Sequence, residues 1–399
     1  MTLRDEAQAL LPELTELRHG LHREPEIGLQ LPRTREKVLA ALDGLPLEIH
    51  EGKGLSSITA VLRGSRPGPA VLLRGDMDAL PLQELADVPY ASVVDGSMHA
   101  CGHDLHTAML VGAAKLLSAR ALELAGSVVF MFQPGEEGCD GAGAMLAEGL
   151  LDVAGVPVIA AYATHVHTNL PAGLVVSRPG TATVAGSAIH IVLRGRGGHG
   201  SMPHQAADPV PAAAEIVTAL QSMVTRTTDA FDPVVLSVGV LRAGTAVNII
   251  PDSAEIGMTL RTCSDHMQEE VLGRIRRLCE HIALAHGLTA EVEMEWGFPA
   301  TVNDADEVAF AESVTAELFG ADHWLTAPQP TMASEDFSRI LAVVPGAFLL
   351  LGACPPGTAD PASAVPNHSP HARFDDSALP VGAALLAGLA QARLDRAGR

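Results

Sequence analysis

The order of the predicted strands and helices is the feature that most restricts the fold of this chain. Up to about residue 180 short apolar strands alternate with helical segments, and this alternation returns after Pro299. The predicted strands are 58–62, 70–73, 128–132, 158–163 and 347–351, and the predicted helices are 7–21, 105–117, 142–150 and 307–318. Such alternation indicates an α/β fold with a mainly parallel sheet that helices cover on both faces.

Between residues 181 and 296 the order changes to β-α-β-β-α-β, with predicted strands at 187–193, 234–241, 254–262 and 289–296 and helices at 206–225 and 267–286. This order is typical of the split-βαβ, ferredoxin-like unit. We therefore expect one α/β domain formed by residues 1–180 and 297–399, interrupted by a smaller α+β domain at 181–296.

Composition narrows the possible partners and the compartment. The 399 residues carry a net charge of −21, which repels phosphate backbones and anionic lipids, so we expect neither nucleic acid nor membrane as a partner. The N-terminal segment has no basic stretch followed by an apolar core, as a secretory signal would. Five cysteines at uneven spacing fit reduced thiols better than a disulfide framework. Together these features predict a cytoplasmic protein.

The densest group of possible metal ligands lies at residues 98–106 (MHACGHDLH). If the segment before Gly102 is extended, His99, Cys101 and His103 alternate onto one side. Thiolate and imidazole together favour Zn²⁺, Co²⁺, Ni²⁺ or Mn²⁺ over Mg²⁺ or Ca²⁺. A single histidine is more often a core or capping residue than a ligand, but three histidines with a cysteine and an aspartate favour a metal site.

Further candidates follow predicted strands, where open α/β sheets bind their ligands. They are Asp76 and Asp78, the pair Glu136 and Glu137, His165 and His167, and His368 in a polar loop near the C-terminus. One carboxylate of a pair can bind metal while the other moves protons. Asp78 could orient a metal-bound imidazole. A solvated turn remains the alternative for the glutamates, and turn formation the alternative for the aspartates.

Several common motifs are missing. The glycine-rich segment 194–200 lacks the spacing of a phosphate-binding loop, which argues against nucleotide binding. Neither Gly-x-Ser-x-Gly nor His-Glu-x-x-His occurs, which excludes the usual serine hydrolases of the α/β-hydrolase fold and the zincins.

The motifs that are present resemble the M20-type metallopeptidases, in the amidohydrolase branch with hippurate hydrolases, N-acyl-amino-acid deacylases and auxin-conjugate hydrolases. The resemblance covers nearly the whole chain. It rests on segments 18–26 (RHGLHREPE), 75–81 (GDMDALP), 98–108 (MHACGHDLHTA), 132–138 (FQPGEEG), 195–204 (GRGGHGSMPH), 244–251 (GTAVNIIP), 334–337 (SEDF) and 368–370 (HSP).

The resemblance implies a metallohydrolase domain with a site for two divalent metal ions, which could be Zn, Mn, Co or Ni. The implied ligands are Cys101, His103, Glu137, His165 and His368. Glu136 is implied as the general base in an attack by metal-bound hydroxide. Asp78 is implied as the aspartate that contacts a metal ligand without binding the metal itself.

The resemblance also implies that the inserted domain is a lid used for dimerisation. His199 is expected to steady the oxyanion in the partner subunit's site, and Asn248 and Arg261 to lie near the substrate carboxylate. Without the resemblance, an intrasheet ion pair for Arg261 and a backbone-bonded loop role for His199 remain open. The chain departs from the family pattern at Cys139-Asp140, where glycine is common and the pocket lining could change.

We therefore expect a cytoplasmic, metal-dependent amidohydrolase that converts an N-acyl-L-amino acid and water to a carboxylic acid and the free amino acid. The substrate is a small molecule, and the protein is expected to be a homodimer or higher homo-oligomer through the inserted domain. A carboxypeptidase or dipeptidase is the alternative, since a peptide is also an N-acyl amino acid. A catalytically silent binding protein is the third hypothesis, against which the presence of Glu136 counts.

Overall fold

The computed structural model describes residues 2–398, which form two compact units. The large unit comprises Met1–Ala182, Val302–Gln329 and Asp336–Arg399, and the small unit comprises Thr183–Thr301 and Pro330–Glu335. The small unit thus extends beyond the predicted 181–296 and gains a segment that lies far along the chain. Thr331 and Ala333 of that segment accept hydrogen bonds from the backbone N–H of Val184, which attaches it to the small unit.

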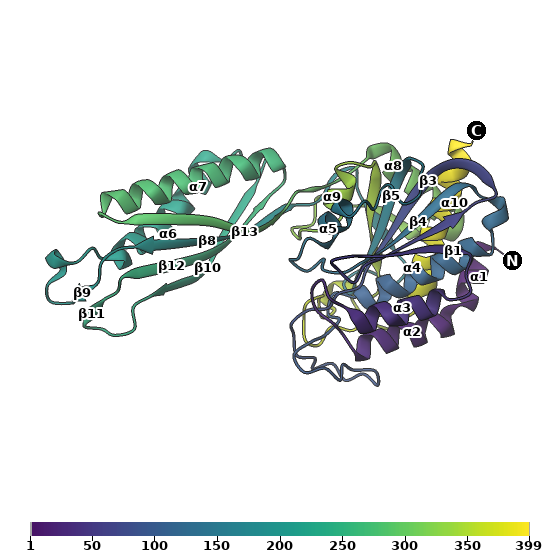
Figure 1. Ribbon diagram of the computed structural model, residues 1–399, viewed down its shortest axis with the longest axis horizontal. Coiled ribbons are helices and arrows are strands. Elements are labelled where there is room, and N and C mark those ends of the chain that lie inside the picture. The colour runs from purple at the N-terminus through teal and green to yellow at the C-terminus, as the bar shows by residue number, and fades with distance from the viewer. Residues whose placement is uncertain (1, 399) are drawn as a thin grey trace. The chain divides into compact units, whose positions relative to one another are not determined.

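An eight-stranded sheet forms the centre of the large unit, in the order β1-β2-β4-β3-β5-β16-β6-β15 (Figure 1). The four strands β4, β3, β5 and β16 pair in parallel, while β1, β2 and β6 make the antiparallel pairings. The strands are β1 Leu47–Glu51, β2 Ile58–Arg63, β3 Arg66–Asp76, β4 Ala125–Gln133, β5 Val158–His167, β6 Val175–Ser177, β15 Trp324–Thr326 and β16 Gly346–Gly352.

Helices cover both faces of this sheet because its central strands are apolar on both sides. In β3, Val71 and Leu73 pack into a core with α2, α4 and α10, and Ala70 and Leu72 pack into a second core with α5 and α9. The helices are α1 Leu3–Ala9, α2 Leu11–Arg23, α3 Pro32–Leu42, α4 His103–Ser118, α5 Gly141–Ala147, α8 Ala305–Phe319, α9 Ser338–Leu341 and α10 Ala378–Ala397, with short 3₁₀ turns at Ala121–Glu123, Ala321–His323 and Pro361–Ser363.

One helical prediction was incomplete, and helices α3, α9 and α10 had no predicted counterpart. The single helix predicted at 7–21 is divided at Leu10, because Pro12 lacks the N–H that would continue the first helix. Helix α10 was not predicted, since residues 378–390 are almost all buried and show no polar face from which a helical period could be read.

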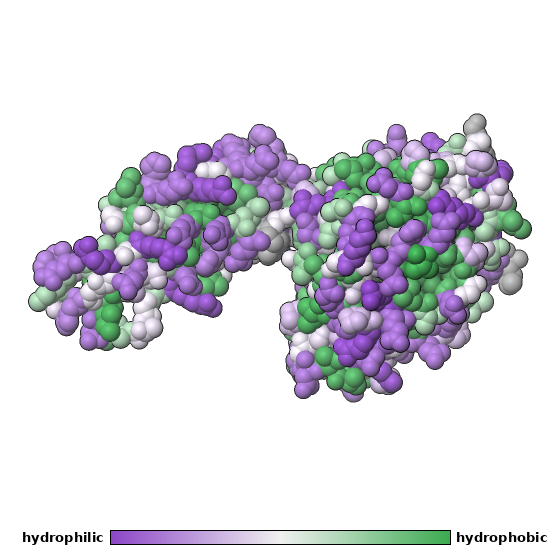
Figure 2. Space-filling view, viewed as in Figure 1, coloured by the Kyte–Doolittle hydropathy of each residue, from purple (hydrophilic) through white to green (hydrophobic). Residues whose placement is uncertain are grey.

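The small unit has a four-stranded antiparallel sheet in the order β10-β12-β8-β13, packed against α6 and α7 (Figure 1). On β8, Ile189, Ile191 and Leu193 alternate into this core, while the outer surface of α7 is hydrophilic (Figure 2). The elements are β8 Ala185–Arg194, β9 Gly198–His199, a 3₁₀ turn Pro203–Gln205, α6 Pro209–Thr227, β10 Val234–Ala243, β11 Ile249–Ile250, β12 Ser253–Thr262, α7 Asp265–Ala285 and β13 Thr289–Phe298.

The predicted fold class is confirmed: a mostly parallel α/β sheet is interrupted by a unit with the ferredoxin-like order of strands and helices. The chain passes between the two units at β7 (Gly180–Thr183) and β14 (Thr301–Asn303), which pair with each other. Within residues 2–398, no helix is long and apolar enough to cross a membrane.

Candidate metal centre

The candidate ligands gather at the carboxyl ends of the central parallel strands. Strand β3 ends at Asp76 and leads to Asp78, β4 ends at Gln133 and leads to the glutamate pair, and β5 carries His165 close to its end. Parallel strands end at the same edge of a sheet, so side chains far apart in the sequence meet there.

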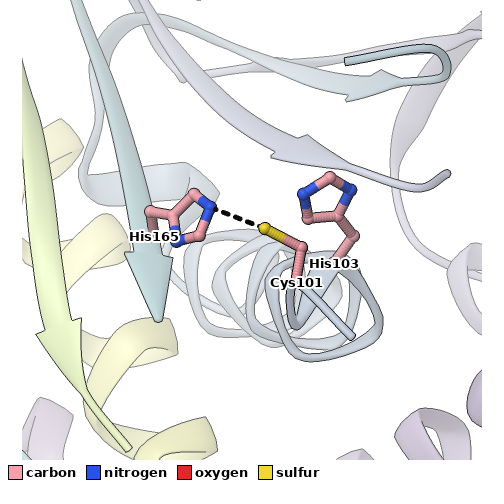
Figure 3. A group of neighbouring side chains, drawn as sticks. All are labelled: Cys101, His103 and His165. Carbon is pink, nitrogen blue, oxygen red and sulfur yellow. Dashed lines mark hydrogen bonds between the residues drawn. The ribbon is translucent and has the colours of Figure 1, made fainter. Parts of the chain in front are cut away.

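Gly102 shapes the turn that presents Cys101 and His103. Its φ of +86° is unfavourable for residues with a side chain, and a Cβ at this position would lie 2.3 Å from Cγ2 of Val166. Helix α4 begins directly after this glycine, so Cys101 and His103 flank the turn and point to the same region (Figure 3). The Sγ of Cys101 lies 3.3 Å from Nε2 of His165.

The loop near the C-terminus adds a further imidazole. His368 adopts a positive φ of 66°, and its backbone N–H donates to the carbonyl of Ala100 over 2.9 Å. Its Nε2 lies 3.1 Å from Sγ of Cys101 and 3.2 Å from a carboxylate oxygen of Glu137. The loop is thus held against the turn that carries the cysteine.

Within the described residues, several overlapping groups of side chains have all their ligand atoms within 4.8 Å of one another. Three of these groups hold the predicted ligands and Glu136, namely Cys101–His103–His165, Cys101–Glu137–His368 and His103–Glu136–Glu137, and a further group joins His103 to Asp76 and His106. The structure therefore brings all five predicted ligands together in the large unit, with Glu136 beside them. Cys101 belongs to two of the groups, so these residues would hold two divalent ions close together.

Asp78 fixes the backbone and one imidazole of the candidate ligands through hydrogen bonds. Its carboxylate accepts hydrogen bonds from the backbone N–H groups of Glu136 and Glu137, each over 3.0 Å, and its carbonyl accepts one from Nδ1 of His103 over 2.9 Å. Nδ1 of His165 likewise donates to the carbonyl of Val166 over 3.0 Å. Both imidazoles therefore use Nδ1 to donate to a carbonyl, so Nε2 is the nitrogen that each can offer to a metal once it is deprotonated.

The donor set fits divalent transition metals. Nε2 of His103 is buried and has no hydrogen-bond partner in the described part of the chain, which is costly unless an ion or water binds it. Thiolate, imidazole and carboxylate are the ligands of Zn²⁺ and its neighbours in the first transition row. The residues therefore fit the pair of ions that the resemblance implied.

The pKa values of three candidate ligands in the metal-free chain show which protons an ion would displace. Burial and the nearby Glu137 raise the pKa of the Cys101 thiol. Hydrogen bonds to Cys101 and Glu137 raise the pKa of His368 to about 10. Burial lowers the pKa of His103, but the charge of Asp76 and its other neighbours outweigh burial and hold it well above its ordinary value. The cluster thus binds protons where a metal would supply positive charge.

His99 does not join this cluster. Its ring is buried with both nitrogens unpartnered in the described chain and lies 6.1 Å from the ring of His22. The predicted alternation of His99, Cys101 and His103 fails because the chain turns at Gly102 and begins a helix at His103. A period of two applies only to an extended segment.

The other three predicted site residues lie in the small unit. Nδ1 of His199 accepts hydrogen bonds from the N–H and hydroxyl of Ser201, over 3.2 and 2.8 Å. Asn248 is exposed, and its carbonyl accepts from the N–H of Gly200. Arg261 on β12 donates to the hydroxyl of Ser334 over 2.6 Å, and burial lowers its pKa. Their roles stay predictions.

The departure at Cys139-Asp140 has a local explanation. Asp140 has a φ of +52°, a conformation that glycine adopts more readily than other residues. Here the carboxylate of Asp140 caps α5 at the N–H of Gly143 and pairs with Arg339 over 3.0 Å. Cys139 is exposed beside it.

The sequence did not indicate that four residues next to the centre, Arg74, Asp76, His106 and Asp336, form one connected group. Asp76, weighed only as a turn residue or metal neighbour, contacts Arg74 and His106, and Arg74 contacts Asp336. They lie in three separate segments of the sequence, and nothing in the spacing indicated that these segments touch.

A family model and curated relatives match most of the chain. The model of peptidase family M20/M25/M40 matches residues 72–392. The chain is 34% identical to thermostable carboxypeptidase 2 of Saccharolobus solfataricus over 96% of this chain and 95% of the relative. It is 35% identical to the N-acetylcysteine deacetylase of Bacillus subtilis, over 96% of this chain and 97% of the relative.

A solved structure adds the metal content of a relative. The crystal structure of the Bacillus subtilis YXEP protein, described as a dinuclear metal-binding peptidase of the M20 family, superposes with a TM-score of 0.81. That protein is 32% identical, and the match covers 97% of this chain and 99% of the other.

Proposed function

The chain belongs to peptidase family M20/M25/M40, and from this premise we propose that it hydrolyses the amide bond of N-acyl-L-amino acids. The products are a carboxylic acid and the free amino acid. The observation that carries the proposal is the cluster of Cys101, His103, Glu137, His165 and His368 with Glu136 beside it.

The five donors would hold two divalent ions, with the thiolate of Cys101 between the two groups. Bound ions of this kind polarise an amide carbonyl and acidify water, which is the chemistry that hydrolysis of an unactivated amide needs. Asp78 keeps the imidazole of His103 in the tautomer that presents Nε2, and it holds the backbone of both glutamates in place.

Glu136 is the proposed general base. Its side chain is nearly buried, and its carboxylate lies within 4.8 Å of ligand atoms of His103 and Glu137. It would accept a proton from the attacking water and pass it to the amide nitrogen, so that the C–N bond breaks and the amine leaves neutral. One water is consumed, and its two hydrogens and oxygen are divided between the acid and the amine.

Residues of the small unit are proposed to bind the substrate. Ser201 donates its backbone N–H to Nδ1 of His199, so the neutral ring carries its proton on Nε2 and could donate it to the oxyanion. A guanidinium matches a carboxylate, which makes Arg261 the proposed partner of the free carboxylate, with Asn248 near it. Action of His199 in a partner subunit, and so a homodimer, belongs to the same proposal.

The choice between deacylase and peptidase rests on the relatives. Similarity to an N-acetylcysteine deacetylase supports a deacylase, and a low aromatic content of 3% favours short acyl groups over aromatic ones. Similarity to a carboxypeptidase keeps peptide cleavage as the second candidate. A cytoplasmic location also stays a prediction, supported by five cysteines that form no disulfide within the described residues.

The test is amino-acid release from a panel of N-acetyl amino acids, N-benzoyl amino acids and dipeptides. Purified protein is assayed with Mn²⁺, Co²⁺ or Zn²⁺ and again with a chelator. We expect chelator-sensitive release that is fastest from N-acetyl substrates. Faster release from dipeptides would favour the peptidase, and no release by metal-loaded protein would contradict a hydrolase.

A further inference from the structure

The backbone of Val166 connects two of the candidate ligands. Its carbonyl accepts hydrogen bonds from Nδ1 of His165 over 3.0 Å and from Nδ2 of Asn367 over 2.9 Å. His165 is a proposed ligand, and Asn367 directly precedes another, His368. Asn367 also donates to the carbonyl of Cys101 over 3.3 Å. The position of the Val166 peptide groups therefore influences both imidazoles.

The N–H of Val166 lies where strand pairing has ended on one side. The register of β3 with β5 stops at Arg74 and Ala163, so β3 supplies no acceptor for the last residues of β5. Val166 is fully buried, and a buried N–H needs a partner. Nε2 of His106 provides it over 2.8 Å.

This hydrogen bond determines the tautomer of His106. Because Nε2 accepts the N–H of Val166, the ring proton is on Nδ1, which donates to the carboxylate of Asp76 over 2.6 Å. The ring of His106 also packs edge-on against the ring of His165, with centroids 4.7 Å apart. Both nitrogens of His106 are thus occupied, which leaves it unsuited to be a metal ligand itself.

A buried ionic network holds Asp76 in turn. Arg74 contacts Asp76 over 2.6 Å and Asp336 over 3.2 Å, and all three side chains are fully buried. The carboxylate of Asp336 also accepts from Nε2 of Gln133 and from the N–H of Ala142. These contacts tie the end of β3 to the end of β4 and to α5, so Asp76 has little freedom to move.

We infer that His106 is a positioning residue: with its tautomer held by Asp76, it continues the strand ladder at Val166 and, together with Asn367, aligns His165 and His368 for metal binding. The inference rests on the proposed metal-dependent function. The sequence motifs assign no specific role to His106 or Asn367.

Two substitutions of similar size distinguish the hydrogen bond that His106 accepts from Val166 from the one that it donates to Asp76. Glutamine can place an amide oxygen near the position of Nε2 and accept from Val166, whereas asparagine reaches only the position of Nδ1. We expect H106Q to keep most of the affinity for metal and H106N to weaken the binding of at least one ion by about 10- to 100-fold. His323 likewise donates from Nδ1 to an oxygen, the carbonyl of Gly173, and lies outside the cluster, so H323N is the control.

The measurement is equilibrium dialysis of the metal-free full-length protein against Co²⁺, followed by visible absorption spectra. We expect two Co²⁺ ions in the wild type and in H323N. In H106N the ligand-field bands should change while the thiolate-to-cobalt band of Cys101 persists. Circular dichroism of each metal-free variant checks its fold. N367A removes the hydrogen bond from Asn367 to the carbonyl of Val166, and we expect it to weaken metal binding as well. It provides the test if H106N does not fold.

The outcomes separate the inference from the function on which it rests. A wild type that binds no Co²⁺ would overturn the proposed function and this inference with it. A wild type with two ions, and H106N and N367A that bind them equally well, would overturn the inference alone. Equal weakening in H106Q and H106N would also overturn it, because the acceptor for Val166 would then be irrelevant.

Discussion

Glu136 and Glu137 are neighbours in the sequence with different surroundings. The carboxylate of Glu137 faces His368, and its side chain is 17% exposed. Burial raises the pKa of Glu137, but the hydrogen bond from His368 and the charge of His103 outweigh burial and lower it. The side chain of Glu136 is buried, and its carboxylate lies within 4.8 Å of ligand atoms of His103 and Glu137. This difference supports a ligand role for one and a proton-transfer role for the other.

The substitution E136Q tests the proton-transfer role. Glutamine keeps the size of the side chain but cannot accept the proton, so we expect kcat to fall by about 10²- to 10⁴-fold with the metal content unchanged. Metal analysis and steady-state kinetics on the same preparation provide the measurement. E137Q is the control, which should lose metal as well as activity. Wild-type kcat in E136Q would contradict its assignment as the base.

Metal binding should strengthen as the pH rises. The pKa of Cys101 is raised and that of His368 is about 10, so both carry protons at neutral pH in the metal-free protein. An ion must displace these protons, and their competition weakens as the pH approaches those pKa values. Calorimetric titration with Zn²⁺ in buffers of different ionisation enthalpy measures the protons released. An affinity that is constant from about pH 6 to about pH 9 would contradict the prediction.

At the scale of elements, the packing of α4 against its neighbours positions His103. Helix α4 lies against α10 and α2 on one face of the central sheet, and 14 of its 16 residues are buried. Gly112 stands at the closest approach, where a Cβ would lie 2.8 Å from Cβ of Ala383 and 2.9 Å from Cδ1 of Leu14. The helix that begins at a candidate ligand thus has little room to shift.

The substitution G112A should therefore destabilise the protein by about 1–3 kcal/mol, because the added methyl group overpacks the helix contacts. G20A is the matched control in α2, where a Cβ would meet nothing within 4 Å. There we expect a gain of about 0.5–1 kcal/mol from the higher helix propensity of alanine. Chemical denaturation of both variants measures the difference. Equal stability of the two variants would argue against tight packing of α4.

At the scale of the whole molecule, each unit has its own hydrophobic core. The large unit has one on each side of its sheet, and the small unit has one between its sheet and α6 and α7. All five candidate ligands belong to the large unit. Binding of metal should therefore stabilise that unit directly.

Removal of metal by a chelator should lower the unfolding temperature. An ion at 100 times its Kd contributes about 2.7 kcal/mol to the folded state, and this contribution is lost on chelation. Calorimetry measures the shift, and hydrogen exchange locates it. We expect faster exchange around Cys101, His165 and His368 and unchanged exchange in α6 and α7. Identical unfolding with and without chelator would contradict a resident metal.

The sequence alone was sufficient for the fold class, and it also supplied the predicted bounds of the inserted unit and the residue types of the candidate ligands. These depend on local patterns, namely the period of apolar residues and short motifs such as 98–108. Helix α10 was not predicted because a helix buried on all sides has no amphipathic period. The segment 330–335 was not predicted to belong to the small unit because it joins that unit from far along the chain.

Only the tertiary structure determined which ligand candidates meet. Cys101 contacts His165 and His368 although 64 and 267 residues separate it from them, and His99, two residues away, is excluded. The hydrogen bond from Val166 to His106 likewise depends on where β3 stops pairing with β5. Sequence patterns report neighbours within a few residues, whereas the parallel strands bring their distant ends to one edge of the sheet, and contacts made there follow from packing.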